Sequence, residues 1–316
     1  MNNLKKSFYS SPKYSIKWNN YFEIYENIFK KFINKKIKIV EIGIGDGGSL
    51  FMWKKFFGKK AKIIGIELNP EAKKLEKYGF KIYLGDQSSQ IFWKNFYKKV
   101  GKIDILIDDG GHTNLQQITS LMESVKNINN GGMIVVEDTH TSFMKNKGFK
   151  NPSKYSFINF TTSLIENIHR RNPMLRKELN YFSKKIFSLE FYDSITVINI
   201  AKKKLLKAKN LENNKKLRNY FDDFRFKKEK IDNNLNELNF FLKFIKNKIS
   251  KRSYLYRIYE NSVIKRYFKN KKKYSYLLTI FKYLLIFIDC LRGNFLPSIF
   301  FADIALTLAL VFFAKL

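Results

Sequence analysis

The sequence predicts an α/β fold: a doubly wound sheet, mostly parallel with a terminal antiparallel hairpin, followed by a C-terminal α-helical extension. Short apolar runs rich in β-branched residues alternate with longer amphipathic stretches between residues 37 and 136. This alternation indicates parallel pairing, because each parallel strand needs a crossover before the next one. Two later apolar runs are separated by Asp193 alone. That connection is too short for a crossover, so it predicts a hairpin.

The expected elements follow one another along the chain. A polar lead and a helix over Tyr21–Phe32 make up residues 1–36, an N-terminal helical lead or lid. Five parallel strands are expected at Ile37–Ile42, Lys62–Leu68, Lys81–Leu84, Ile103–Ile107 and Met133–Val136. Helices are expected between them at Ser49–Phe57, Pro70–Tyr78, Gln90–Val100 and Leu115–Asn127, and the hairpin at Ile186–Tyr192 and Ser194–Ile200.

Composition divides the rest of the chain. Residues 37–204 form the expected enzyme domain, and residues 205–275 form a basic helical region with 21 Lys and Arg against 7 Asp and Glu. The whole chain has a formal net charge of +33, but lysine is raised together with Asn, Ile, Phe and Tyr, as in proteins from AT-rich genomes. No arginine-rich or recognition-helix pattern accompanies the charge, which disfavours a nucleic-acid partner. The basic region suits an anionic lipid surface instead.

Residues 276–316 form a hydrophobic tail. Within it, Phe295–Ala314 is a run of 20 residues with one charge, Asp303, and that length could cross a bilayer. Two interpretations stand: membrane association, spanning or interfacial, and a buried helical hairpin or contact in a homo-oligomer. The single cysteine, Cys290, excludes a disulfide framework, and no apolar run follows the basic N-terminal residues to suggest a secretory signal. We expect a cytoplasmic enzyme, attached in the first interpretation to the inner face of the cytoplasmic membrane.

The first three strands end in residues suited to a nucleoside-containing cofactor. Gly43, Gly45 and Gly48 after strand one satisfy G-x-G-x-x-G, which lets the backbone turn tightly and approach a ligand. Glu67 ends the second strand, where an acid can accept hydrogen bonds from both ribose hydroxyls. Asp86 and Gln87 follow the third strand, where an acid and an amide can bind the edge of an adenine. A dinucleotide enzyme and a methyltransferase share these features.

The last two parallel strands end in a different set of residues. Asp109, Glu137 and Asp138 supply hard oxygen ligands at adjacent strand ends, and this set suits Mg²⁺. Mg²⁺ that binds two neighbouring hydroxyls would lower the pKa of one of them. His112, three residues past Asp109, is placed to accept the proton as a general base. The sequence therefore predicts catalytic roles for His112 and Asp109, and metal binding by the three carboxylates.

Together these motifs resemble a known family. The segments EIGIGDGGS, GIELNP, GDQ, IDDGGH and EDTHTSF between Val40 and Phe143 look like class I S-adenosylmethionine-dependent methyltransferases, which are Rossmann-like. Within that class the chain is most similar to the metal-dependent sugar O-methyltransferases that tailor macrolide and tetracenomycin glycosides, a pattern shared with the cephalosporin hydroxylase-type family. The resemblance covers residues 9–203, about two thirds of the chain.

The resemblance implies a cofactor, a reaction and further site residues. Glu41, Gly43 and Gly45 would line the methionine and ribose end of S-adenosylmethionine, and Asp108 would lie near its amino-acid part. The implied reaction is Mg²⁺-assisted methyl transfer to a sugar hydroxyl. The acceptor would be a glycan, a glycolipid or a glycosylated small molecule, and the basic segment and the tail suggest a glycan or lipid-linked saccharide among these. Two rivals remain: a non-catalytic membrane-surface or nucleic-acid adaptor with a methyltransferase-like domain, and an NAD-dependent oxidoreductase.

Overall fold

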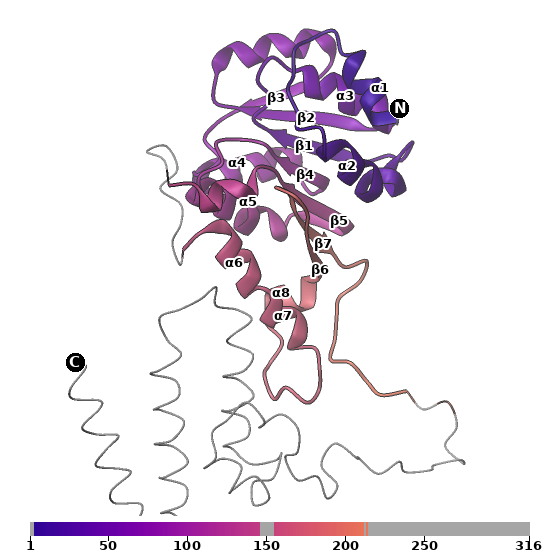
Figure 1. The fold of residues 1–316 in the computed structure, drawn as a ribbon, viewed down its shortest axis with the longest axis vertical. Coiled ribbons are helices and arrows are strands. Elements are labelled where there is room, and N and C mark those ends of the chain that lie inside the picture. The colour runs from indigo at the N-terminus through magenta and orange to yellow at the C-terminus, as the bar shows by residue number, and fades with distance from the viewer. Residues whose placement is uncertain (1–2, 146–154, 212, 214–316) are drawn as a thin grey trace, which may run out of the picture. The chain divides into compact units, whose positions relative to one another are not determined.

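The computed structural model describes residues 3–145, 155–211 and 213. Its centre is a seven-stranded sheet in the order β3-β2-β1-β4-β5-β7-β6 (Figure 1). The strands are β1 (Lys38–Ile42), β2 (Lys62–Glu67), β3 (Lys81–Leu84), β4 (Ile103–Asp108), β5 (Ile128–Val136), β6 (Ile186–Phe191) and β7 (Thr196–Ile200). Strands β1 to β5 pair in parallel, and β7 pairs antiparallel with both β5 and β6. The predicted five parallel strands and terminal hairpin are confirmed.

Helices cover both faces of the sheet. They are α1 (Asn3–Tyr9), α2 (Tyr21–Phe29), α3 (Gly48–Phe57), α4 (Gln90–Val100), α5 (Asn114–Val125), α6 (Phe157–Ser163), α7 (Ile165–His169) and α8 (Tyr181–Lys185). Three 3₁₀ segments join them: η1 (Lys30–Phe32), η2 (Pro70–Tyr78) and η3 (Thr139–Phe143). The expected helix over Tyr21–Phe32 therefore changes to 3₁₀ in its last turn.

Two expected elements differ from those in the structure. The segment Pro70–Tyr78 is a 3₁₀ helix rather than an α-helix, held between the side-chain cap of Asn69 and the left-handed Gly79. Strand β5 begins at Ile128, five residues before the expected start. The intervening Asn-Asn-Gly-Gly suggests a turn, but it is accommodated by a shift in the β4–β5 register and by Gly131 at φ 82°.

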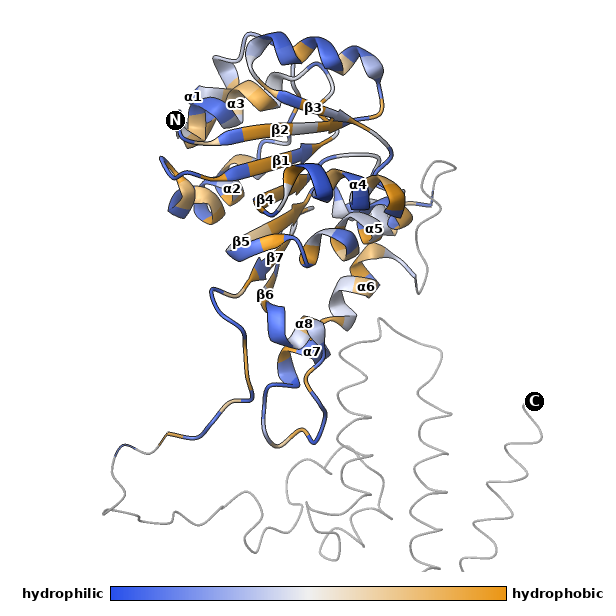
Figure 2. Cartoon of the chain, turned by 180° about the vertical axis from the view of Figure 1, so that it is seen from behind, coloured by the Kyte–Doolittle hydropathy of each residue, from blue (hydrophilic) through white to orange (hydrophobic). Residues whose placement is uncertain are grey.

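Side chains alternate between the two faces of the sheet along each strand, and they form one hydrophobic core on each face. On one face Ile39, Ile63 and Ile105 pack with residues of α1, α2 and α3, including Trp53. On the other face Val40, Ile64 and Leu106 pack with residues of α4, α5 and α6. Figure 2 shows apolar residues, in orange, along the strands and on the helices beside them. Burial on both faces fixes the strand register, because a slip of one residue would turn every apolar side chain to the wrong face.

Most of the sequence-based predictions for the C-terminal third lie outside the described residues. These are the bulk of the basic helical region 205–275 and the whole hydrophobic tail 276–316, including Phe295–Ala314. Among the helices that the structure describes, none combines the length and the apolar character needed to span a bilayer.

Candidate active site

Acidic side chains gather where β4 and β5 end. Asp109 directly follows β4, and Glu137 and Asp138 directly follow β5. The register brings these strand ends level, since Asp108 pairs with both Ile42 and Val136. The Glu137 amide also donates to the Asp108 carbonyl at 2.9 Å. Parallel pairing thus places three carboxylates at the carboxyl edge of the sheet, where open α/β sheets bind ligands.

Lys17, from the segment between α1 and α2, reaches into this edge. Its Nζ donates to Asp109 Oδ2 at 2.5 Å and to Glu137 Oε1 at 2.7 Å, and lies 3.7 Å from Glu41 Oε1. The side chain is 2% exposed. Burial lowers the pKa of Lys17, but the carboxylates of Asp109, Glu137 and Glu41 outweigh burial and hold the pKa well above its usual value. The three carboxylates therefore favour the charged form of Lys17 at this edge.

Two tyrosines of α2 bind the same group of acids. The Tyr25 hydroxyl donates to Glu137 Oε1, and the Tyr21 hydroxyl donates to Asp138 Oδ1 at 2.5 Å. Burial and the adjoining carboxylate raise the pKa of both hydroxyls, so both remain protonated donors. Burial and the neighbouring Asp109 raise the pKa of Glu137, although Lys17 and Tyr25 act in the opposite direction. Helix α2 thus holds two of the three carboxylates by its hydroxyl groups.

His112 and Asp138 approach each other from the loops after β4 and β5. His112 Nε2 lies 3.5 Å from Asp138 Oδ2. Both residues have left-handed backbones, with φ of 57° and 53°, a conformation that is strained for non-glycine residues and frequent at functional sites. Ligand atoms of Asp109, His112 and Asp138 all lie within 4.8 Å of one another. Two carboxylates and an imidazole fit a divalent cation, so these three residues form a candidate metal centre.

Glu41, expected to line the cofactor, lies inside β1 and is fully buried. Its carboxylate accepts hydrogen bonds from Ser49 Oγ at 2.7 Å and from Trp53 Nε1 at 3.0 Å. Burial raises the pKa of Glu41, against the lowering effect of Lys17 and of these two donors. Glu41 therefore ties β1 to the start of α3, the helix that follows the glycine loop.

The glycine loop passes close to the ends of β2 and β4. Gly43 has φ +78°, and a Cβ there would lie 2.1 Å from the Asp109 carbonyl oxygen, so only glycine fits. The Gly45 amide donates to Glu67 Oε2 at 3.1 Å, while Glu67 Oε1 accepts from the Leu68 amide at 2.8 Å. The structure thus brings Gly43, Gly45 and the half-buried Glu67 together at the edge formed by β1 and β2.

Gln87 and Asp86, adjacent in sequence, have different surroundings. Gln87 is buried; its Nε2 donates to Asp108 Oδ1 and its Oε1 accepts from the Gly111 amide, both at 2.9 Å. Asp86 is exposed and accepts from the Ser88 amide. Burial raises the pKa of Asp108, against the hydrogen bond from Gln87, and Asp108 Oδ2 is buried with no partner among the described residues. Gln87 therefore ties the ends of β3 and β4 together.

The sequence analysis did not select Lys17, Tyr21 and Tyr25. Their spacing held a signal: the two tyrosines are one helical turn apart on the expected N-terminal helix, and Lys17 lies four residues before the first. Tyrosine on a buried helical face needs a partner for its hydroxyl. In this chain the partners are carboxylates more than 100 residues away in sequence.

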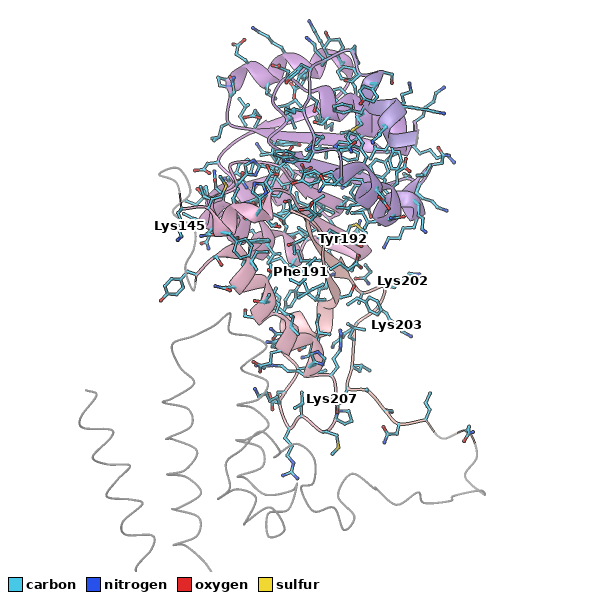
Figure 3. All side chains as sticks on the ribbon, in the orientation of Figure 1. Lys145, Phe191, Tyr192, Lys202, Lys203 and Lys207 are labelled. Carbon is cyan, nitrogen blue, oxygen red and sulfur yellow. The ribbon has the colours of Figure 1, made fainter. Side chains whose placement is uncertain are left out.

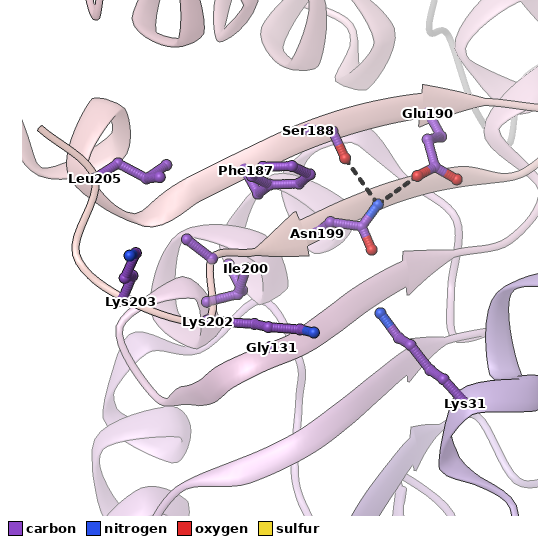
Figure 4. A pocket seen from close by; sticks show the side chains of 11 residues that line it. Lys31, Gly131, Phe187, Ser188, Glu190, Asn199, Ile200, Lys202, Lys203 and Leu205 are labelled. Atoms are coloured by element: carbon purple, nitrogen blue, oxygen red, sulfur yellow. Dashed lines mark hydrogen bonds between the residues drawn. The ribbon is translucent and has the colours of Figure 1, made fainter. Parts of the chain in front are cut away.

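A pocket of about 520 Å³ lies at the opposite end of β5 (Figure 4). Gly131, near the start of β5, lines it, whereas the acidic edge follows the last residue of the same strand. Asn199 in the pocket donates to Ser188 and Glu190. Figure 3 shows Lys202 and Lys203 on the chain that leaves β7. The other lining residues include Lys31, Phe187, Lys202 and Lys203. This pocket is therefore separate from the candidate active site.

Comparison with known proteins gives relatives of one chemical class. The chain is 30% identical over 196 residues to 8-demethyl-8-alpha-L-rhamnosyl tetracenomycin-C 2'-O-methyltransferase of Streptomyces olivaceus, an alignment covering 58% of this chain and 51% of that protein. It is 28% identical over 205 residues to demethylmacrocin O-methyltransferase of Streptomyces fradiae, covering 61% and 51%. The chain thus spans about half the length of these curated relatives. No family model matches it.

Among solved structures, the MycE methyltransferase of the mycinamycin pathway, in complex with Mg, SAH and mycinamycin VI, superimposes with a TM-score of 0.55. The two chains are 25% identical over 63% of this chain and 52% of MycE. The fold is that of a class I methyltransferase. The strand order has the antiparallel β7 between β5 and β6. It places the glycine loop and the acids together at the carboxyl edge of the parallel strands.

Proposed function

We propose that this protein transfers a methyl group from S-adenosylmethionine to a sugar hydroxyl with the help of a divalent metal, Mg²⁺ in the first instance. The observation that carries the proposal is the convergence of Asp109, His112 and Asp138 beside the glycine loop of a methyltransferase fold. The matched relatives, which are O-methyltransferases of glycosylated compounds, support the same reaction.

The reaction needs few groups from the protein. The bond between the methyl carbon and the sulfonium sulfur breaks, a bond from that carbon to the hydroxyl oxygen forms, and the sulfonium becomes a neutral thioether. The hydroxyl proton passes to an imidazole at the same edge, where His112 and His140 lie 3.5 and 4.0 Å from Asp138 oxygens. A bound divalent metal would lower the pKa of the acceptor hydroxyl. The chain supplies position and charge complementarity.

For the cofactor we propose the edge formed by β1, β2 and β4. Gly43 and Gly45 give close backbone approach, and Glu67 is placed beside them to accept from ribose hydroxyls. Asp108 Oδ2 has no hydrogen-bond partner among the residues that the structure describes, which supports a place for the cationic amino group of the cofactor beside it. Glu41 stabilises this edge from the core, through its hydrogen bond from Ser49. The exposed Asp86 is available to bind the adenine. Gln87 is bonded to the Gly111 amide, so its proposed role is to position the loop rather than to contact the adenine.

The proposed acceptor is a saccharide-bearing compound. More specifically, we propose a glycan or lipid-linked saccharide made at the cytoplasmic face of the membrane, which would give the protein a role in polysaccharide biosynthesis. Sequence alone supports this specific acceptor, because the basic residues of 205–275 and the apolar run Phe295–Ala314 suit attachment to an anionic surface. Flotation of the full chain with vesicles tests it. Binding to vesicles that contain anionic lipid, weakened by salt, is expected; equal recovery without vesicles would contradict it.

Calorimetric titration of the purified full chain tests the reaction class. We expect S-adenosylmethionine to bind with and without Mg²⁺, and NAD to give no heat. Radiolabelled methyl transfer to glycosylated acceptors, with and without metal chelator, then tests catalysis. Binding of NAD in place of S-adenosylmethionine would favour an oxidoreductase. If neither bound and nucleic acid or vesicles bound with steep salt dependence, the protein would be an adaptor.

A further inference from the structure

The pocket near the start of β5 lies where the sheet is irregular in two places. The register of β6 against β7 shifts between Ile186 and Ser188, which makes Phe187 the extra residue of a bulge. In β5, Gly131 lies within the register shift against β4. A bulge turns a side chain in a new direction, and bulges are over-represented at sheet edges and next to active sites. The strands themselves therefore form this pocket.

Hydrogen bonds fix the chain that forms one wall of the pocket. The Ala201 carbonyl accepts from the Gly131 amide at 3.1 Å, and the Leu205 amide donates to a carbonyl of α8 at 3.0 Å. Lys202 and Lys203 lie between these two anchors and line the pocket. Both lysines are therefore presented by a backbone that is held at each end.

Three lysines line the pocket, against one carboxylate. They are Lys31, Lys202 and Lys203, and none of them forms an ion pair with another residue that the structure describes. Figure 4 shows the amino groups of Lys31 and Lys202 pointing toward each other, from η1 and from the chain after β7. Burial lowers the pKa of Lys31; the Glu190 carboxylate acts against this, and the Lys202 ammonium group adds to it. Two ammonium groups that repel each other favour an anion between them.

The one carboxylate, that of Glu190, is already bound by two donors. Its Oε1 accepts from Asn199 Nδ2 at 2.6 Å, and its Oε2 accepts from the Tyr192 hydroxyl at 2.7 Å. The same nitrogen of Asn199 also donates to Ser188 Oγ at 3.0 Å. The polar side chains of this wall bind one another, so the lysines are left as the main donors for a ligand.

The remaining lining is apolar. Phe187 is 60% exposed, and Ile200 and Leu205 line the pocket with it. The volume of about 520 Å³ is within the range of pockets that hold whole small molecules, and it is far more than one inorganic ion needs. Leu206, the next residue along the chain, is 68% exposed. Apolar side chains rimmed by lysines suit a ligand with a charged headgroup on an apolar chain.

We propose that this lysine pocket, defined by Lys31, Lys202, Lys203 and Phe187, binds the phosphate headgroup of an anionic lipid, with the first part of the lipid chain against Phe187. A phosphate monoester has three acceptor oxygens and a charge of about −1.5 to −2 at pH 7, which matches two or three ammonium groups. A nucleotide fits less well, because the polar side chains of the wall are bonded to one another and leave few groups to bind a base.

The inference goes beyond methyl transfer and does not rest on it. Gly131 and the acids lie toward opposite ends of β5, so a lipid in the pocket leaves the candidate active site open. The pocket would attach the folded domain itself to a lipid surface, in addition to any attachment through residues 212–316.

Calorimetric titration of the full-length protein with dihexanoyl phosphatidic acid tests the site, at concentrations where this short lipid is monomeric. Inorganic phosphate and dihexanoyl phosphatidylcholine are the comparison ligands. Dihexanoyl phosphatidic acid should bind about tenfold more tightly than either, because only it offers both the dianion and the apolar chains. Added salt should weaken its binding.

Two lysine variants test the contact with the phosphate. Lys31→Met and Lys202→Met should each weaken the binding of dihexanoyl phosphatidic acid about tenfold, the loss of one charge-assisted hydrogen bond. Lys204→Met is the matched control, because Lys204 is exposed on the same segment and is not part of the lining. Glu190→Gln removes the one carboxylate while it keeps an acceptor for Asn199, and it should strengthen binding about threefold.

Phe187→Ala tests the contact with the lipid chain. It should weaken the binding of dihexanoyl phosphatidic acid about fivefold, through lost apolar burial, and leave the affinity for inorganic phosphate unchanged. Phe191→Ala is its control, because Phe191 is exposed on the same strand and is not part of the lining. Thermal unfolding establishes that each variant is folded.

Equal affinity for inorganic phosphate would overturn the lipid assignment, since the apolar wall would then contribute nothing. Equal affinity for phosphatidylcholine, no saturable binding, or losses in the pocket variants no larger than in their controls would overturn the site itself. Affinity for S-adenosylmethionine, measured on the same samples, should be the same in every variant. A protein that binds the lipid here but not S-adenosylmethionine would refute the proposed function alone, and the reverse result would refute this inference alone.

Discussion

The two halves of the carboxyl edge are held together in different ways. In the half formed by β1 and β2, partners are close in sequence: Ser49 donates to Glu41 over 8 residues and Gly45 to Glu67 over 22. In the half formed by β4 and β5, Lys17 reaches Asp109 over 92 residues and Tyr25 reaches Glu137 over 112. The proposed cofactor half is therefore held by hydrogen bonds between residues close in sequence. The acids at the ends of β4 and β5 are held instead by Lys17 and helix α2, which are distant in sequence.

The largest effect on folding is expected at the link between these distant parts. Lys17→Met leaves Asp109 and Glu137 without their ammonium partner, and breaking a buried ion pair costs about 3 kcal/mol. Chemical unfolding of the full chain measures this loss. Lys13→Met should leave stability unchanged; an equal loss in both variants would show that Lys17 is no more important than a surface lysine.

The next effect concerns catalysis at the acid-rich half alone. Asp138→Asn removes a charge from the candidate metal centre and should lower the rate of metal-dependent methyl transfer about 100-fold, equivalent to about 2.7 kcal/mol. Its affinity for S-adenosylmethionine should stay the same, since Asp138 lies outside the cofactor half. Glu123→Gln, a carboxylate in a surface pair with Lys126, is the matched control. Loss of cofactor affinity in Asp138→Asn would contradict the division of the edge.

A third variant tests the junction of the two halves. In Gly110→Ala the new Cβ would lie 1.8 Å from Gln87 Oε1, the oxygen that accepts from the Gly111 amide. Such crowding should cost about 2 kcal/mol of stability and weaken cofactor binding, because the ends of β3 and β4 must move apart. Gly79→Ala meets no atom within 4 Å and should cost only its backbone strain, about 1 kcal/mol. Thermal unfolding and calorimetry compare the two variants.

The smallest effect is expected within the locally bonded half. Ser49→Ala removes one of the two donors to the buried Glu41 carboxylate and should cost about 1 kcal/mol, with Trp53 still in place. Equilibrium unfolding measures it, with Ser163→Ala on an exposed helical position as control. If Ser49→Ala lowered the free energy of unfolding as much as Lys17→Met does, the two halves of the edge would not differ in how strongly their hydrogen bonds stabilise the fold.

The sequence predicts the fold well because its signals are local. Apolar periodicity marks the strands, and the short connection of four residues between β6 and β7 marks the hairpin. It also brings Asp109, Glu137 and Asp138 to the ends of β4 and β5, because those residues follow apolar runs directly. What it misses depends on contacts between distant segments. Nothing near Glu137 in sequence indicates that Lys17 and Tyr25 bind it, or that His112 lies beside Asp138.

The long separation between Lys17 and its partners has a consequence for synthesis of the chain. Glu137 and Asp138 are made more than 100 residues after Lys17 and helix α2. Until the end of β5 has been made, Tyr21 and Tyr25 lack the carboxylates that they bind in the folded protein, those of Asp138 and Glu137. The nascent chain can begin to build the β1–β2 pair during this interval, whereas the acidic edge is assembled only when the end of β5 meets helix α2.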